Sequence, residues 1–125
     1  MRDFRKYEAW QLSHKLVLEI YLLTKDFPVE EKFGLTSQIR RSSSSIPTNF
    51  AEGSSKISEK DFTRFIDIAL GSATEVDYQL ELSKDLKYIS EEKYLTLNNK
   101  IISIKKMLFA LRQKILIDIN NNKTQ

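Results

Sequence analysis

The segment YLTLNNKIISIKKMLFALRQKI, residues 94–115, carries the clearest structural pattern in the chain. Its apolar residues recur at alternating separations of three and four, as they do on one face of an α-helix. The repeat continues for about three heptads, which is typical of a helix packed along its length against other helices. The segment therefore predicts a long helix with one buried face in an all-α protein. Its seam consists of Tyr94, Leu97, Ile101, Ile104, Leu108, Leu111 and Ile115.

The same spacing recurs in three earlier segments, which predicts four helices in all. Pro28 marks the end of the first segment, Gly53 suits the position after the second, and Ser90 suits the cap of the fourth. These signals predict helices at roughly 6–26, 35–52, 58–87 and 90–119, followed by a frayed tail at 120–125. The three further seams are Tyr7, Trp10, His14, Val17 and Tyr21; Leu35, Ile39, Ser42, Ile46 and Asn49; and Phe62, Ile66, Ala69, Ala73, Val76 and Leu80.

The short connections between these segments decide the expected architecture. Helices joined by short loops lie antiparallel to their sequence neighbours. A chain of 125 residues suits one domain, residues 1–125. The sequence therefore predicts an all-α, antiparallel up-down-up-down four-helix bundle. Three-helix and helix-turn-helix folds are less favoured, because the helices are too long and too uniformly patterned.

The serine-rich stretch RRSSSSIPTNF, residues 40–50, is the least ordinary part of the second segment. Ile39, Ile46 and Phe50 keep helical spacing across it, which favours a helix over a flexible serine linker. Serine hydroxyls can bond to carbonyls of the preceding turn, and their small size permits close helix packing. Pro47 removes one helical hydrogen bond and should kink the helix. A phosphate-binding loop is less favoured, because no glycine-rich pattern accompanies the serines.

Composition excludes several classes of function. The chain has no cysteine, so disulfides and zinc–thiolate sites are excluded. Its single histidine, His14, lies on the first seam, where we expect a packed side chain and not a ligand. Acidic pairs occur without metal-ligand spacing and suit a solvated helix face. We therefore expect no enzyme activity, catalytic residue, metal or cofactor. No apolar run approaches the roughly 20 residues of a membrane helix, so we expect a cytoplasmic protein without membrane contact.

Two helices carry more apolar residues than one core seam requires. A helix that is apolar nearly all round needs burial on more than one side, so we expect a homo-oligomer. The alternative is a set of scattered surface leucines, which are common in monomers. The excess residues are Leu12, Leu16, Leu18, Ile20, Leu22 and Leu23 in the first helix, and Leu95, Ile102, Met107, Leu116 and Ile119 in the fourth.

Charge is distributed unevenly along the expected bundle, although the net charge is only +3. One end collects eight basic and six acidic residues, while the opposite end carries five basic and eight acidic residues. In an oligomer, a repeated basic end could engage phosphates, so we expect a binding or scaffold protein that associates there with structured RNA or DNA. The alternative is a purely protein–protein interaction module without nucleic-acid binding, its partner unknown. The candidate nucleic-acid-binding residues are Arg2, Arg5, Lys6, Lys56, Lys60, Arg64, Arg112 and Lys114.

Two long stretches resemble a known family. They are FPVEEKFGLTSQIRRSSSSIPTNFAEGSS, residues 27–55, and DFTRFIDIALGSATEVDYQLELSKDLKYIS, residues 61–90. Both are similar to the bacterial four-helix-bundle proteins encoded in intervening sequences of 23S ribosomal RNA genes. The resemblance covers most of the chain, with departures at Ser42, Ser43 and Phe50, where the family often carries alanine, alanine and isoleucine.

This resemblance implies a four-helix bundle that assembles into rings of five, and it implies no known reaction. Counting back from the turn near residue 55, Arg41 falls within a helical turn of Glu75, so we expect an Arg41–Glu75 pair. The motif residues expected in structural or interface roles are Gln38, Arg41, Pro47, Asn49, Glu52, Gly53 and Glu75.

Overall fold

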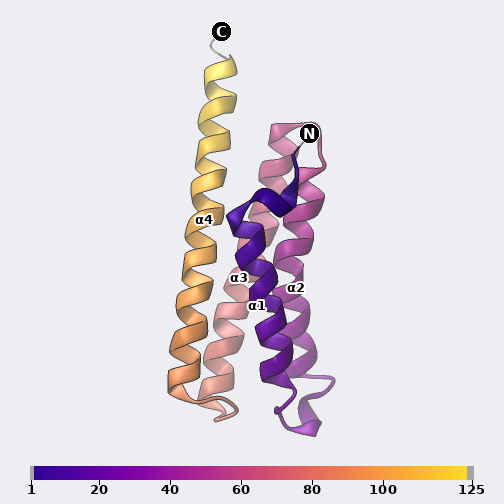
Figure 1. Ribbon diagram of the computed structural model, residues 1–125, viewed down its shortest axis with the longest axis vertical. Helices are drawn as coiled ribbons and strands as arrows, with labels where there is room; N and C mark the ends of the chain where they lie inside the picture. Colours follow the sequence, from indigo (N-terminus) through magenta and orange to yellow (C-terminus); the bar gives the residue numbers. More distant parts are fainter. Residues whose placement is uncertain (1, 124–125) are drawn as a thin grey trace.

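Four α-helices make up most of the structure (Figure 1). The computed structural model describes residues 2–123, and these residues contain no strand, so the predicted all-α fold is confirmed. Short 3-10 helices precede α1 and link α1 to α2. The elements are η1 (Phe4–Lys6), α1 (Glu8–Thr24), η2 (Val29–Glu31), α2 (Leu35–Ser54), α3 (Glu59–Asp85) and α4 (Glu91–Lys123).

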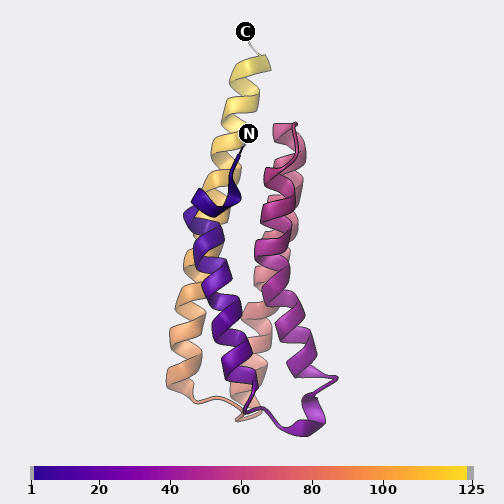
Figure 2. The ribbon, with the colours of Figure 1, turned by 45° about the vertical axis from the view of Figure 1, so that its right-hand side comes forward.

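The helices pack side by side, and contacts between them run in opposite residue order. Between α2 and α3, the hydroxyl of Ser42 lies 3.1 Å from the carboxylate of Glu75, and the hydroxyls of Ser45 and Ser72 are 3.0 Å apart. Between α3 and α4, Asp67 pairs with Arg112 while Asp77 accepts a hydrogen bond from Asn98. Later residues of one helix thus meet earlier residues of the next, as the two ribbon views also show (Figures 1 and 2).

The serines of α2 behave as expected. Ser42, Ser43 and Ser44 each donate a hydrogen bond to a backbone carbonyl three or four residues earlier, at 3.0, 3.1 and 3.1 Å. These bonds satisfy hydroxyls within their own helix, so Ser42 and Ser43 can be buried. Pro47 lies inside α2, which continues to Ser54; a kink there stays a prediction.

The core follows the predicted seams in three helices but not in α1. Every predicted seam residue of α3 is buried, and the seam of α4 is buried at Leu97, Ile101, Ile104, Leu108 and Ile115. In α1 the prediction was wrong. Its buried residues are Ala9, Ser13, Leu16, Ile20 and Thr24. Tyr7 and Trp10 of the predicted seam are half-buried against the core, while His14 and Tyr21 are exposed.

From Trp10 onward, the aromatic row of α1 lies on a different side of that helix from the buried residues. Trp10 packs edge-on against Phe4, with ring centroids 4.9 Å apart, and stacks on His14 at 5.1 Å. His14 is exposed and is not the packed residue that was expected. Because α1 is apolar on both sides, spacing alone did not distinguish its core side from this aromatic side.

Glu31 ties the two connections at one end of the bundle together. One carboxylate oxygen accepts the backbone N–H of Leu35 at 3.2 Å, which caps the start of α2. The other accepts the hydroxyl of Tyr88, in the α3–α4 connection, at 2.8 Å. This single side chain therefore joins two loops that are far apart in sequence.

The Tyr88–Glu31 bond predicts a loss of stability in alkali. The hydrogen bond to Glu31 holds the pKa of Tyr88 above its ordinary value of 10.0, with desolvation and the charges of Glu31 and Glu30 adding to the effect. A group with a raised folded-state pKa contributes stability below its unfolded pKa, and this stability is lost as pH rises through the folded pKa. Urea unfolding from pH 8 to 11 should therefore show a steeper alkaline decline for the protein than for Tyr88→Phe. Equal declines would contradict the prediction.

The C-terminal helix is longer than predicted. It continues to Lys123 and projects beyond the other three helices (Figures 1 and 2). The frayed tail expected from residue 120 is therefore wrong for residues 120–123, while residues 124 and 125 lie outside the described part. Within the described residues, no helix has the combined length and hydrophobicity that crossing a membrane requires.

Candidate functional site

Arg2, a predicted nucleic-acid contact, fastens the N-terminal segment to the bundle. Its guanidinium donates to the carbonyl oxygens of Lys56, at 2.5 Å, and Ser54, at 3.4 Å, and forms an ion pair with Glu59. The same group lies 4.6 Å from the ring centroid of Phe62. These contacts use both terminal nitrogens of Arg2 and leave 17% of its side chain exposed, so Arg2 supports the fold.

Replacing Arg2 by alanine should lower the free energy of unfolding by about 1–2 kcal/mol, because charge-assisted hydrogen bonds are lost together with packing on Phe62. Arg5→Ala is the matched control, since its side chain is 70% exposed and lies 3.9 Å from Asp3. Urea denaturation at fixed protein concentration measures both. Equal effects of the two substitutions would show that the Arg2 contacts do not stabilise the fold.

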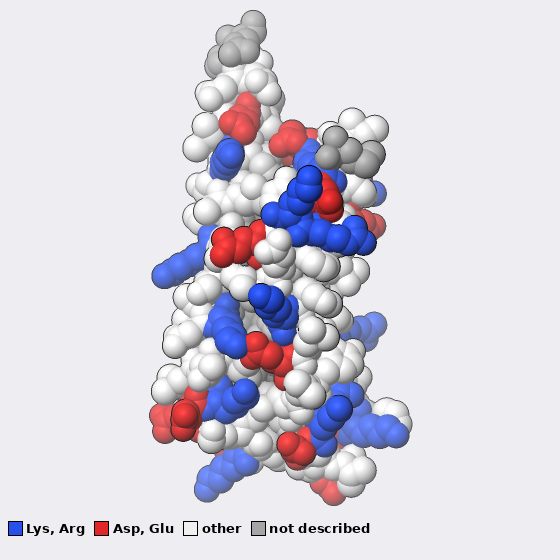
Figure 3. All heavy atoms as spheres, viewed as in Figure 1, with Lys and Arg blue, Asp and Glu red and all other residues white. Residues whose placement is uncertain are grey.

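Among the remaining cations of the predicted basic end, the arginines form ion pairs with carboxylates and, within the described residues, the lysines do not. Arg64 lies 3.9 Å from Asp61, and Arg112 lies 2.5 Å from Asp67. Four lysines at this end form no ion pair with any residue from 2 to 122. They are Lys6, Lys56, Lys60 and Lys114. The face in view in Figure 3 accordingly shows basic and acidic groups interspersed, without one continuous basic area.

Several family-motif residues form a polar row along the junction of α2 and α3. Asn49 donates to the backbone oxygen and the hydroxyl of Ser45, both at 2.8 Å, and Ser45 in turn meets Ser72 of α3. Gln38 and Glu52 continue the same row by helical spacing, and both are exposed. The motif thus places polar groups where these two helices meet the surface.

The expected Arg41–Glu75 pair is not formed. The Glu75 carboxylate accepts a hydrogen bond from Ser42, and Arg41 is exposed, without an ion pair among the described residues. Sequence counting placed the two residues on the correct turns, but a shorter neighbour reaches the carboxylate.

The other two motif residues serve packing inside the chain. Pro47 is buried and shares a shallow groove with Trp10 and Val17 of α1. Gly53 faces α3, where a Cβ atom would lie 2.5 Å from the Cβ of Phe65. A glycine there allows α2 and α3 to approach closely at the end where they are joined.

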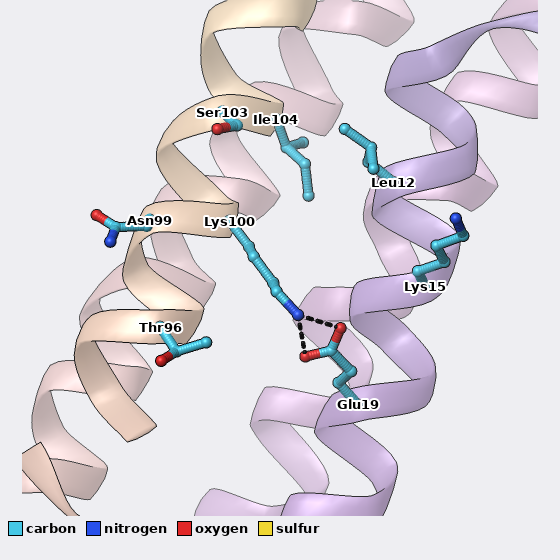
Figure 4. A pocket seen from close by; sticks show the side chains of 8 residues that line it. All are labelled: Leu12, Lys15, Glu19, Thr96, Asn99, Lys100, Ser103 and Ile104. Atoms are coloured by element: carbon cyan, nitrogen blue, oxygen red, sulfur yellow. Dashed lines mark hydrogen bonds and ion pairs between the residues drawn. The ribbon is translucent and has the colours of Figure 1, made fainter. Parts of the chain in front are cut away.

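The groove between α1 and α4 is crossed by an ion pair. It encloses about 480 Å³, and Leu12 and Ile104 line its walls. Figure 4 shows Lys100 reaching across it to both carboxylate oxygens of Glu19, at 2.6 and 2.8 Å. No histidine lines the groove, and the described residues contain no cluster of three or more potential metal ligands.

The most distinctive surface feature is an apolar row on the outer side of α4. Its members are separated by seven, seven and eight residues, so they follow one face of the helix. Leu95 and Ile102 were among the excess apolar residues expected from the sequence, and Phe109 and Ile117 were not. Phe109 keeps the heptad offset of the first two from the core seam, and Ile117 lies one residue beyond it. We call this row the α4 stripe: Leu95, 52% exposed; Ile102, 39%; Phe109, 54%; and Ile117, 59%.

Comparison with known proteins gives the family. The chain matches the family described as 23S rRNA-intervening sequence protein over residues 5–110. It is also similar to the crystal structure of a protein with unknown function from the S23 ribosomal protein family of Bacteroides thetaiotaomicron. The TM-score is 0.77 and the identity 31%, over 84% of this chain and 95% of that one. No curated protein matches. The chain therefore belongs to the 23S rRNA-intervening sequence protein family.

Proposed function

We propose that the protein is a non-catalytic scaffold that works as a homo-oligomer. The observation that carries this proposal is the α4 stripe, where four large apolar side chains lie on one exposed helix face. Scattered surface leucines are ordinary in monomers, but a row at heptad spacing has the form of a helix-packing seam. Burial against other copies would remove this row from water.

The oligomeric state tests the proposal directly. At micromolar concentration, sedimentation velocity should give a mass that is a multiple of the 14.6 kDa chain. Five chains would agree with the ring that the family resemblance implies. Phe109→Glu should shift the protein towards monomers, because it places a charge in the stripe.

Ile57→Glu is the matched control for this substitution. Ile57 is a fully exposed apolar residue in the α2–α3 connection, outside the stripe, so the variant should keep the assembled mass. A wild-type protein that stays monomeric at tens of micromolar would overturn the proposal of self-assembly.

A second candidate function is association of the assembly with structured RNA or another nucleic acid. It is favoured by the charge of α4, which carries seven basic residues and one acidic residue after Glu92. The unpaired lysines at the predicted basic end would be repeated in every copy of an assembly, and repeated cations strengthen phosphate binding. Recognition would then follow charge and shape more than base sequence.

Fluorescence anisotropy with a structured ribosomal RNA fragment across a salt series tests this candidate. The triple variant Lys6→Gln, Lys60→Gln and Lys114→Gln should weaken binding and flatten its salt dependence. The control with the same change in charge is Lys25→Gln, Lys87→Gln and Lys93→Gln, at the opposite end. Arg2 is left intact because it supports the fold. Absence of binding at low salt would reject this candidate and favour a purely protein–protein module.

A further inference from the structure

Gly71 has no evident role within its own chain. It lies in the middle of α3, and its φ is not positive. A Cβ atom at this position would meet nothing within 4 Å. Glycine weakens a helix interior relative to alanine, so neither backbone geometry nor internal packing explains its presence. Open space directly over a helix backbone is, however, what another helix needs for a close approach.

Gly71 belongs to a second apolar row on the outer side of α3, opposite the core seam. Ile68 is 42% exposed, Tyr78 62% and Leu86 45%, while Leu82 is half-buried and also packs against the core. With Gly71, these residues are separated by three, seven, four and four positions, which is the spacing of a helix-packing seam. We call this row the α3 outer seam: Ile68, Gly71, Tyr78, Leu82 and Leu86.

The charges around the two rows are complementary. From Phe65 to Asp85, α3 carries five acidic residues and one lysine, whereas α4 is strongly basic after Glu92. Asp67, Asp77 and Asp85 have cations within 4 Å in the same chain. Glu75 and Glu81 of α3, and Lys93, Lys106 and Lys114 of α4, form no ion pair among the described residues. Each helix therefore retains charges that the other could neutralise across an interface.

The two rows also lie at matching heights, that is, at matching positions along the bundle axis. Within one chain, Asp67 is level with Arg112, and Asp77 lies between the levels of Asn98 and Lys105. By interpolation, Phe109 is level with the Ile68–Gly71 turn, and Lys106 falls between Gly71 and Glu75. A closed ring whose axis runs along the helices keeps these heights from copy to copy and joins two different faces of the chain.

We propose that the α4 stripe of one copy docks on the α3 outer seam of a second copy, with Phe109 over Gly71 and Lys106 paired with Glu75. This inference rests on the proposed self-assembly and assigns its two faces. Phe109 acts as the aromatic anchor, and the missing side chain at position 71 makes the space that receives it.

Substitution at Gly71 separates assembly from folding. Gly71→Gln adds a good helix former at an exposed site, so the free energy of unfolding of the monomer should be unchanged or higher. Its self-association should weaken about tenfold or more, as expected when an anchor loses its pocket. Thr74→Gln, one turn along on the same exposed helix, is the matched control and should have a smaller effect.

Charge reversal and mixing test the pairing of the two faces. Lys106→Glu and Glu75→Lys should each weaken association, and the double variant should recover part of it. Phe109→Glu and Gly71→Gln should each weaken self-association when present alone. Mixed in equal amounts they should form a one-to-one pair, because the first keeps an intact α3 outer seam and the second an intact α4 stripe.

Mass measurements distinguish the possible failures. If the wild type assembles and Phe109→Glu dissociates it while folded Gly71→Gln keeps the full mass, the α4 stripe uses another partner face and this inference is wrong. Self-assembly would then still stand. If the wild type is monomeric, both proposals fail together.

Discussion

Replacing Phe62 by alanine should lower the free energy of unfolding by about 3–5 kcal/mol, the usual cost of truncating a fully buried aromatic residue. Phe62 is 1% exposed and lies where three parts of the chain meet. Its ring packs edge-on against Phe50 of α2, with centroids 5.5 Å apart, and against Tyr7 at 6.2 Å. The guanidinium of Arg2 lies over the same ring. Truncation would open a cavity and remove the surface on which the N-terminal segment rests.

Phe33→Ala is the control for this loss of an aromatic side chain. Phe33 is 89% exposed, so its truncation should change stability by no more than about 0.5 kcal/mol. Urea unfolding followed by circular dichroism measures both variants at one protein concentration, because self-association would couple stability to concentration. A loss below about 1 kcal/mol for Phe62→Ala would mean that the site collapses around the smaller residue.

The sequence was sufficient for the fold because, in three of the four helices, the most regular apolar row is the one that forms the core. In α3, the row from Phe62 to Leu80 keeps separations of three and four throughout, whereas the outer row is interrupted by a gap of seven residues. In α1, Leu16 and Ile20 on one side compete with Trp10 and Val17 on another. Which side of α1 faces the core depends on where the other helices pack against it, and the spacing of residues within α1 does not contain that information.

The candidate site was harder to predict, because charge in a sequence does not reveal its partners. Arg2, Arg64 and Arg112 contribute to an apparent basic end, yet each meets a carboxylate in the folded chain. The α4 stripe could have been found earlier. Phe109 continues the seven-residue spacing of Leu95 and Ile102, so a search for a second heptad row would have included it. Ile117 lies one residue past that spacing and would have been missed.

Gly53, at the end of α2, and Gly71, in the middle of α3, have opposite surroundings in the structure. Gly53→Ala should destabilise the fold by about 1–3 kcal/mol, the range for overpacking a close contact. The new Cβ would lie 2.5 Å from the Cβ of Phe65 and 3.1 Å from Cδ1 of Phe62. The first of these atoms is fixed to the backbone, so α2 and α3 would have to separate. This cost exceeds the gain of roughly 1 kcal/mol in helix propensity.

Gly71→Ala should change the stability of the separated chain in the opposite direction. Its Cβ would meet no atom within 4 Å, so only the helix-propensity gain of about 0.5–1 kcal/mol remains. Urea unfolding of both variants in dilute solution, where association is absent, gives the comparison. A destabilised Gly71→Ala monomer would show that position 71 has an internal packing role after all. If Gly53→Ala lowers the free energy of unfolding and Gly71→Ala raises it, then Gly53 serves close packing within the chain. The reason for a glycine at position 71 would then lie in a contact with another molecule.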